Sequence, residues 1–204
     1  MAVPKATGHR FTYADYRQWP GDERWELIDG VAYAMAPAPT IAHQSLVLAI
    51  AAQIDDALDG TPCRTLIAPV DVLLPVADEA DDQATTVVQP DVLVVCDPAK
   101  VTESNIRGAP EWIIEVISPA TARHDHLTKR ALYERAGVRE YWLVHPVDRL
   151  VTLYRLQDGR YGGPEIVEMT GERSPAVFPE VVIRWQAVLD KLPLGAARSV
   201  NPHA

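Results

Sequence analysis

Two nearly apolar stretches, QPDVLVV over residues 89–95 and EWIIEVIS over residues 111–118, decide the fold class. Short apolar runs of this kind are typical of central strands that are covered on both faces of a β-sheet, and strands are expected at about 91–96 and 111–117. The first run contains Asp91 and the second contains Glu115. Because a buried, isolated carboxylate is costly, each is expected to be paired, protonated or bound to a metal ion.

The chain before these strands predicts a hairpin followed by a helix. Asp29-Gly30 is a strong two-residue turn signal, so residues 25–35 are expected to form a β-hairpin. A helix is expected from about Ile41 to Leu58, because its apolar residues recur at helical spacing. His43 lies on the apolar face of this helix.

The chain after these strands predicts a second helix and further strands. Asp125 is the expected N-cap and Gly137 the expected C′ residue of a helix of about three turns. Lys129 falls in the apolar stripe of this helix, where its ammonium group either extends to solvent or reaches a buried anionic partner. The remaining strand-like segments, before a short C-terminal helix, are residues 64–74, 139–145, 150–156, 164–169 and 181–184.

Length and composition are those of one globular domain. The 204 residues, 48% hydrophobic and 23% charged, suffice for one buried core and are few for two. We therefore expect a single α/β (α+β) domain, a mixed β-sheet flanked by helices, with its core at about residues 20–190 and flexible ends. No apolar stretch approaches the roughly 20 residues of a membrane span, and no secretory leader is visible. A cytoplasmic location is expected by elimination.

Charge is unevenly distributed along the chain. The net charge of −9 opposes simple nucleic-acid binding, which relies on cationic side chains. The acidic run at 78–82 is expected to be a solvated loop, whereas the basic segment at 123–139 is the expected contact if nucleic acid binds. Two cysteines cannot form a disulfide framework, and Cys96 is expected to be a small buried residue.

Asp91, Glu115 and Lys129 together suit hydrolytic phosphoryl chemistry. Two carboxylates that converge at strand ends can hold Mg²⁺ or Mn²⁺, which prefer oxygen ligands. Such an ion would polarise a phosphodiester and lower the pKa of water, while a nearby ammonium group would stabilise the developing negative charge.

Glu26 and His43 are additional candidates for catalytic residues. Glu26 is a possible metal ligand from the hairpin, and its structural alternative is an ion pair with Arg24. His43 is a possible base or water-orienting residue, and its structural alternative is a satisfied histidine in the core.

The motifs around Asp91 and Glu115 resemble those of the PD-(D/E)xK nuclease superfamily. The segment that follows resembles the Uma-two family of restriction-endonuclease-like proteins, which are widespread in bacteria. The matching residues there are Asp125, Lys129, Tyr133, Gly137 and Glu140-Tyr141-Trp142-Leu143-Val144. The N-terminal ELIDG motif at 26–30, the prolines after it and His43 extend the resemblance to roughly residues 20–190.

This resemblance implies a restriction-endonuclease-like core with an N-terminal hairpin, often assembled as a homodimer, and a metal-dependent endonuclease that acts on DNA. Asp91 and Glu115 match the two acidic metal ligands of the superfamily. Its lysine usually stands two residues after the second acid, where this chain has Ile117. Lys129 occupies the place from which a migrated lysine reaches the same site. Independently of the resemblance, the apolar strands near residues 141–156 could offer an interface.

Two alternatives belong to other functional classes. A catalytically inactive nuclease-fold module would serve binding or assembly, and the acidic charge and Ile117 favour it. A small-molecule hydrolase using the same acids would turn over small phosphate esters and would not bind polynucleotides.

Overall fold

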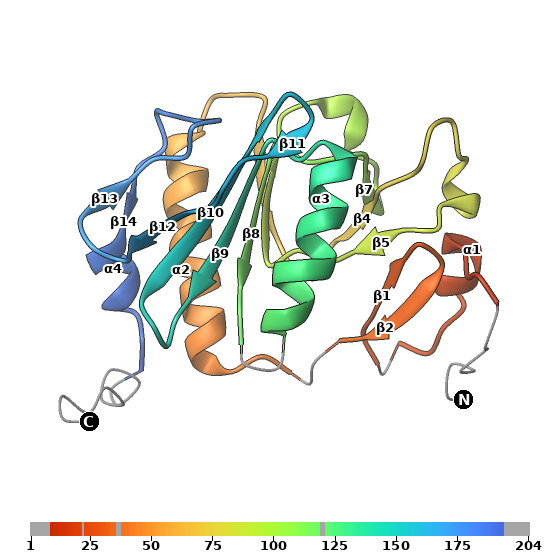
Figure 1. Cartoon of the computed structure of the whole chain (residues 1–204), viewed down its shortest axis with the longest axis horizontal. Helices are drawn as coiled ribbons and strands as arrows, with labels where there is room; N and C mark the ends of the chain where they lie inside the picture. The colour runs from red at the N-terminus through yellow and green to blue at the C-terminus, as the bar shows by residue number, and fades with distance from the viewer. Residues whose placement is uncertain (1–8, 22, 36–37, 119–120, 194–204) are drawn as a thin grey trace.

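The computed structural model describes residues 9–21, 23–35, 38–118 and 121–193, and its centre is a large mixed β-sheet with helices on both faces (Figure 1). The order in this sheet is β11-β10-β9-β8-β6-β3, and β12 also pairs with β10. Its strands are β3 (Arg64–Ile67), β6 (Val92–Val95), β8 (Trp112–Val116), β9 (Glu140–His145), β10 (Leu150–Gln157), β11 (Arg160–Tyr161) and β12 (Glu165–Glu168).

A smaller sheet has the order β2-β1-β5-β4-β7 and carries the predicted hairpin. Its strands are β1 (Trp25–Ile28), β2 (Val31–Ala34), β4 (Asp71–Leu73), β5 (Val87–Val88) and β7 (Asn105–Arg107). The hairpin turns at Asp29-Gly30, where both residues have positive φ, as predicted from the turn signal. A short pair, β13 (Glu172–Arg173) with β14 (Ile183–Arg184), packs beside the final helix.

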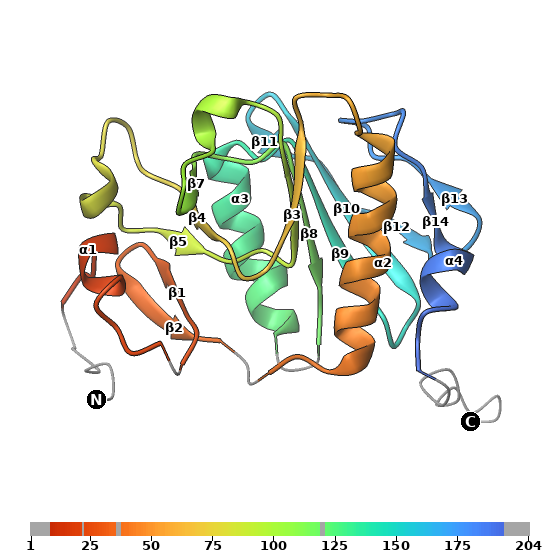
Figure 2. The same ribbon diagram turned by 180° about the vertical axis from the view of Figure 1, so that it is seen from behind.

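The two long helical segments cover opposite faces of the large sheet, as the front and back views show (Figures 1 and 2). One face packs against helix α2 (Ile41–Ala57) and the other against helix α3 (Arg130–Ala136). A π-helix over His124–Lys129 runs directly into α3. The shorter helices are α1 (Tyr13–Tyr16), α4 (Trp185–Leu189) and the 3₁₀ turns Asp81–Gln83 and Pro98–Lys100.

Alternation along the central strands explains where the acidic residues lie. Ile114 and Val116 of β8 join the core that contains α2, whereas Ile113 joins the core that contains α3. Since successive side chains of a strand point to opposite faces, Glu115 faces the α3 side of the sheet. The strands predicted around Asp91 and Glu115 are therefore confirmed as central and buried.

Two predicted elements were wrong in their details. Residues 64–74 form two strands in different sheets, β3 and β4, and Pro69 lies between them, because proline cannot donate the hydrogen bond that a continuous strand needs. Asp125 is not an N-cap, since the helix begins before it and Asp125 lies buried within the π-helix. Gly137 ends the helix with φ of 89°, as predicted.

Of three further expectations for the surface, two need correction. Cys96 is half-buried and forms a disulfide with Cys63, which lies opposite because Arg64 pairs with Val95 in the register of β3 and β6. The acidic run at 78–82 lies at the surface, as expected, and two of its side chains form ion pairs there, Asp81 with Arg107 and Asp82 with Arg17. The apolar strands near 141–156 are buried within the sheet, flanked by β11 and β12, and offer no free interface.

Some expectations concern parts of the chain outside this description. Residues 1–8 and 194–204 of the predicted flexible ends lie outside the described residues. Residues 9–19 were also expected to be flexible, but they include helix α1, whose Tyr13 is buried. Within the described ranges, no helix combines the length and the apolar character needed to cross a membrane.

Candidate active site

A cavity of about 600 Å³ lies beside the point where the two sheets meet. Its walls come from the hairpin, the start of α2, the edges of β6 and β8, and the π-helix. All five candidate residues line it, namely Glu26, His43, Asp91, Glu115 and Lys129. The fold therefore gathers residues that are separated by up to about half of the chain length in sequence.

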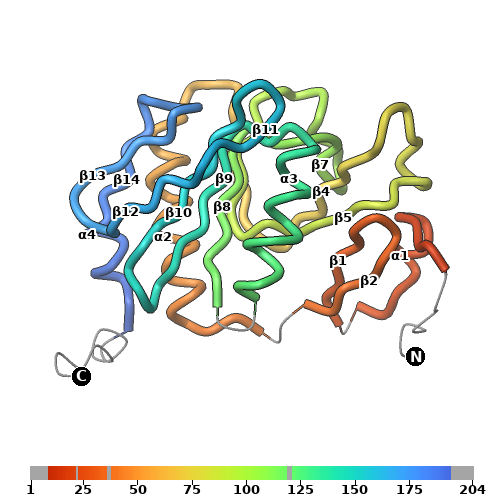
Figure 3. Tube along the Cα trace, viewed as in Figure 1, coloured from red at the N-terminus to blue at the C-terminus, as the bar shows by residue number. Residues whose placement is uncertain are grey.

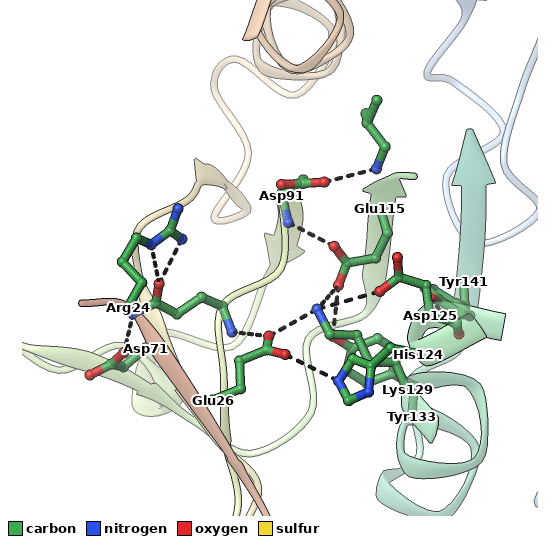
Figure 4. Close-up of polar contacts among 12 residues, drawn as sticks. Arg24, Glu26, Asp71, Asp91, Glu115, His124, Asp125, Lys129, Tyr133 and Tyr141 are labelled. Atoms are coloured by element: carbon green, nitrogen blue, oxygen red, sulfur yellow. Dashed lines mark hydrogen bonds and ion pairs between the residues drawn. The ribbon is translucent and has the colours of Figure 1, made fainter. Parts of the chain in front are cut away.

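Asp91 and Glu115 meet because β6 and β8 are antiparallel neighbours. Val92 pairs with Ile114, which places Asp91 beside Glu115. The backbone N–H of Asp91 donates to Oε2 of Glu115 at 3.4 Å, and the N–H of Val116 donates to Oδ2 of Asp91 at 2.8 Å (Figure 4). Each acid is thus anchored by the backbone of the neighbouring strand.

Lys129 lies at the centre of the acidic group and does not extend to solvent. Its side chain is 5% exposed, and Nζ lies 2.9 Å from Oε1 of Glu115 and 2.8 Å from Oε1 of Glu26 (Figure 4). Oδ1 of Asp125 lies 3.8 Å from the same nitrogen. Burial opposes the charged ammonium, but the three carboxylates outweigh it and raise the pKa of Lys129 well above its ordinary value.

Glu26 belongs to the site and does not pair with Arg24. Its carboxylate binds Lys129, accepts a hydrogen bond from the backbone N–H of Gln89 at 3.0 Å and lies 3.4 Å from Nε2 of His124. Burial raises the pKa of Glu26, but the combined effect of Lys129 and the hydrogen bonds is larger. The pKa is therefore lowered from 4.5 to about 2. Glu26 is therefore ionised at neutral pH.

The carboxyl groups of the site outnumber the ammonium group of Lys129 that binds them. Burial raises the pKa of Glu115, and the neighbouring carboxylates of Asp91, Asp125 and Glu26 raise it further against the attraction of Lys129. The pKa of Asp125 is raised for the same reason, burial first. A second cation near these oxygens would relieve this repulsion.

The donor set at Asp91 and Glu115 fits a hard divalent cation. In the described part of the chain, no hydrogen bond uses Oδ1 of Asp91, and Oε2 of Glu115 accepts only the long bond from Asp91. Among the described residues, no group of three or more His, Cys, Asp or Glu side chains is arranged to hold a metal ion. Mg²⁺ commonly takes only one or two carboxylates and completes its shell with water and substrate phosphate.

His43 is a site residue by position and not a core histidine. The side chain of Thr40 caps the start of α2 by accepting from the His43 N–H, which places His43 in the first turn. Its Nε2 lies 3.1 Å from Oδ2 of Asp91, and its side chain is 19% exposed. Burial lowers the pKa of the imidazole, but the contact with Asp91 outweighs it and raises the pKa above 6.5.

Four residues of the site had no predicted role there. His124 and Asp125 enter through the π-helix, whose irregular turn the sequence does not reveal. Tyr133 donates its hydroxyl to Oε1 of Glu115 at 3.0 Å, and its presence in the apolar stripe with Lys129 was the available signal. Gln89 follows β5 and contacts Glu26 through its backbone, for which no sequence signal exists.

The model of one protein family matches residues 13–186, and that family, Uma2, is described as "Putative restriction endonuclease". The chain belongs to the Uma2 family. This is the Uma-two family that the motifs resemble. The match covers most of the chain and includes every residue of the site.

Two known proteins are similar to this Uma2 chain. The uncharacterized protein slr1290 of Synechocystis is 27% identical over 158 residues, which cover 76% of this chain and 79% of the relative. A crystal structure from Anabaena variabilis, described as a "putative nuclease belonging to DUF820", has a TM-score of 0.69 and 18% identity. It covers 90% of this chain and 99% of the other, so the predicted fold class is confirmed.

The basic segment at 123–139 of this Uma2 protein is not a continuous cationic surface. Lys129 is buried in the site, Arg130 pairs with Glu134 and Arg135 pairs with Asp29. Only part of the predicted basic surface therefore remains for a phosphate backbone.

Proposed function

We propose that the chain is a metal-dependent endonuclease that hydrolyses phosphodiester bonds in DNA. The convergence of Asp91 and Glu115 beside the buried ammonium group of Lys129, on the wall of an open cavity, carries this proposal. Membership of the Uma2 family supports the same class of reaction.

Each residue of the site has a distinct proposed role. Asp91 and Glu115 would hold Mg²⁺ or Mn²⁺, which when bound would polarise the phosphodiester and make nearby water more acidic. Lys129 places a fixed positive charge where negative charge develops on the phosphoryl oxygens. Glu26 keeps that ammonium in position, and His43 orients Asp91 and can exchange a proton with a water molecule in the cavity.

Replacement of Asp91 tests this assignment directly. Asp91→Ala is expected to abolish cleavage of supercoiled, linear or single-stranded DNA, or of RNA, in the presence of Mg²⁺ or Mn²⁺. The matched control is Asp55→Ala, which removes an exposed acid near the other end of α2 and should leave cleavage unchanged. Thermal unfolding confirms that both variants fold. Cleavage by Asp91→Ala at the wild-type rate would show that another site acts.

A catalytically inactive binding or assembly module is the second candidate. Ile117 stands where the superfamily has its lysine, and Lys129 is already held by three carboxylates. This candidate predicts a folded protein that cuts no polynucleotide and binds Mn²⁺ weakly or not at all. Assembly as a homodimer remains a prediction of the family resemblance, and sedimentation equilibrium tests it.

A further inference from the structure

The cavity extends beyond the acidic group into a part that the proposed chemistry does not use. On the side of the hairpin it is lined by Arg24, Tyr33, Met35 and Gln89. Its volume of about 600 Å³ is comparable with that of pockets that enclose small organic ligands, roughly 300–1,000 Å³. This part of the cavity therefore has room for a portion of the substrate next to the reacting phosphate.

Arg24 is held in place without losing its charge. Its Nε and Nη2 donate to the side-chain oxygen of Gln89 at 3.1 and 2.7 Å, so its partner is a neutral amide. The amide nitrogen of Gln89 in turn donates to Asp71 at 2.9 Å (Figure 4). It also donates to the hydroxyl of Tyr16 at 3.1 Å. Among the described residues, Arg24 forms no ion pair. It is also the one arginine among the described residues that line the cavity.

This arrangement suits recognition of a phosphate group. A guanidinium group has a fixed fork of N–H donors, and only two of its nitrogen atoms bind Gln89. The remaining donors can bind a phosphate oxygen, and charge-assisted bonds of this kind are the strong ones.

Tyr33 supplies an aromatic surface on the same part of the cavity. It lies on β2, is 36% exposed, and its ring centroid is 4.9 Å from that of His124. His124 is held beside Glu26, so the two rings are fixed relative to the acidic group. An exposed aromatic ring next to a phosphate-binding cation is the combination that binds nucleic-acid bases by stacking.

We propose that this part of the cavity binds one unpaired nucleotide of the substrate, with its base on Tyr33 and its phosphate on Arg24. A base inside a duplex has both faces covered by its neighbours, so Tyr33 can contact only a base that has left the stack. The substrate class is therefore single-stranded DNA or RNA, or an unpaired end or flap. This inference rests on the proposed nuclease function, because the nucleotide is bound as part of the substrate that the nuclease would cleave.

The test measures binding without cleavage. A fluorescent short oligothymidylate is titrated with the full chain in the presence of EDTA, and its duplex with oligodeoxyadenylate is titrated in parallel. The wild type is expected to bind the single strand more tightly than the duplex. Arg24→Ala and Tyr33→Leu are each expected to weaken single-strand binding by roughly tenfold or more. Tyr33→Phe, which keeps the ring, should bind more tightly than Tyr33→Leu.

The matched control for charge is Arg184→Ala. Arg184 is exposed and pairs with Glu172 beside α4, at the opposite end of the molecule from the hairpin (Figure 3). Equal losses from Arg24→Ala and Arg184→Ala would indicate non-specific attraction and overturn the proposal. Equal binding of duplex and single strand, or no binding of either, would also overturn it.

The outcome is separable from that of the cleavage assay. Single-strand binding that depends on Arg24 and Tyr33 supports the nucleotide subsite even if the protein cuts nothing, in which case the nuclease proposal fails. Cleavage that is unaffected in both variants would support the nuclease and overturn the subsite.

Discussion

The buried ammonium group of Lys129 lies within 4 Å of three carboxylates, those of Glu26, Glu115 and Asp125. Lys129→Met keeps most of the side-chain volume and removes the charge. Because Glu26, Glu115 and Asp125 would then repel one another without a cation, we expect a loss of about 3–5 kcal/mol in the free energy of unfolding. Urea denaturation measures this loss. An added Glu26→Gln should restore part of it, and an unchanged urea midpoint in Lys129→Met would refute this account.

The pKa of the His43 imidazole reports on the contact between His43 and Asp91. Asp91 holds the pKa of His43 above 6.5, so their contact contributes stability that is complete below pH 6.5 and is lost as the pH rises through the raised pKa. In Asp91→Asn, burial and the charge of Arg24 still lower the pKa of His43, and only a hydrogen bond to the backbone of Val116 opposes them, so the pKa should fall. Titration of the imidazole by NMR in metal-free buffer measures both values. The same pKa in the two proteins would exclude the contact in solution.

At the level of elements, the hairpin determines where Glu26 lies. Gly30 has φ of +78°, and a Cβ atom added there would lie 2.8 Å from Cβ of Arg10. Gly30→Ala should therefore cost more than Gly60→Ala, where φ is +74° and nothing lies within 4 Å. We expect about 1 kcal/mol for Gly60→Ala and up to about 3 kcal/mol for Gly30→Ala, measured by urea denaturation. Equal losses of unfolding free energy in Gly30→Ala and Gly60→Ala would mean that Arg10 moves away from the added Cβ atom without a cost in free energy.

The elements that could be predicted are those with a strong local pattern. The hairpin follows from Asp29-Gly30, and β6 and β8 follow from their apolar runs. The split of residues 64–74 between two sheets depends on tertiary packing, and the π-helix around Asp125 depends on contacts with Glu26 and Tyr141, whose hydroxyl binds the carbonyl of Asp125. Local propensity carries no information about either.

The residues of the site also divide into those that a local sequence pattern predicts and those that depend on tertiary packing. Asp91, Glu115 and Lys129 could be selected because each places a charge inside an apolar pattern. Arg24 and Tyr33 stand in an ordinary hairpin sequence, and only the meeting of two sheets brings them to the cavity that Asp91 and Glu115 also line.

For the whole molecule, the balance of buried charge predicts a response to divalent ions. An ion that binds only the folded state stabilises it by about 2.7 kcal/mol at a hundredfold excess over its dissociation constant. Mn²⁺ or Mg²⁺ should therefore raise the midpoint of thermal unfolding, and the rise should vanish in an Asp91→Ala, Glu115→Gln double variant. Asp55→Ala should keep the full rise. A rise of equal size in all three proteins would indicate surface binding elsewhere.

Gln89, Pro90 and Asp91 are the three residues between β5 in the small sheet and β6 in the large one. The backbone N–H of Gln89 donates to Glu26, and that of Asp91 donates to Glu115. Between them, the ring of Pro90 fixes the φ angle of Pro90. The link between the two sheets is therefore held at both of its ends by carboxylates of the site. We expect any change that moves Glu26 or Glu115 to alter how the two sheets are joined.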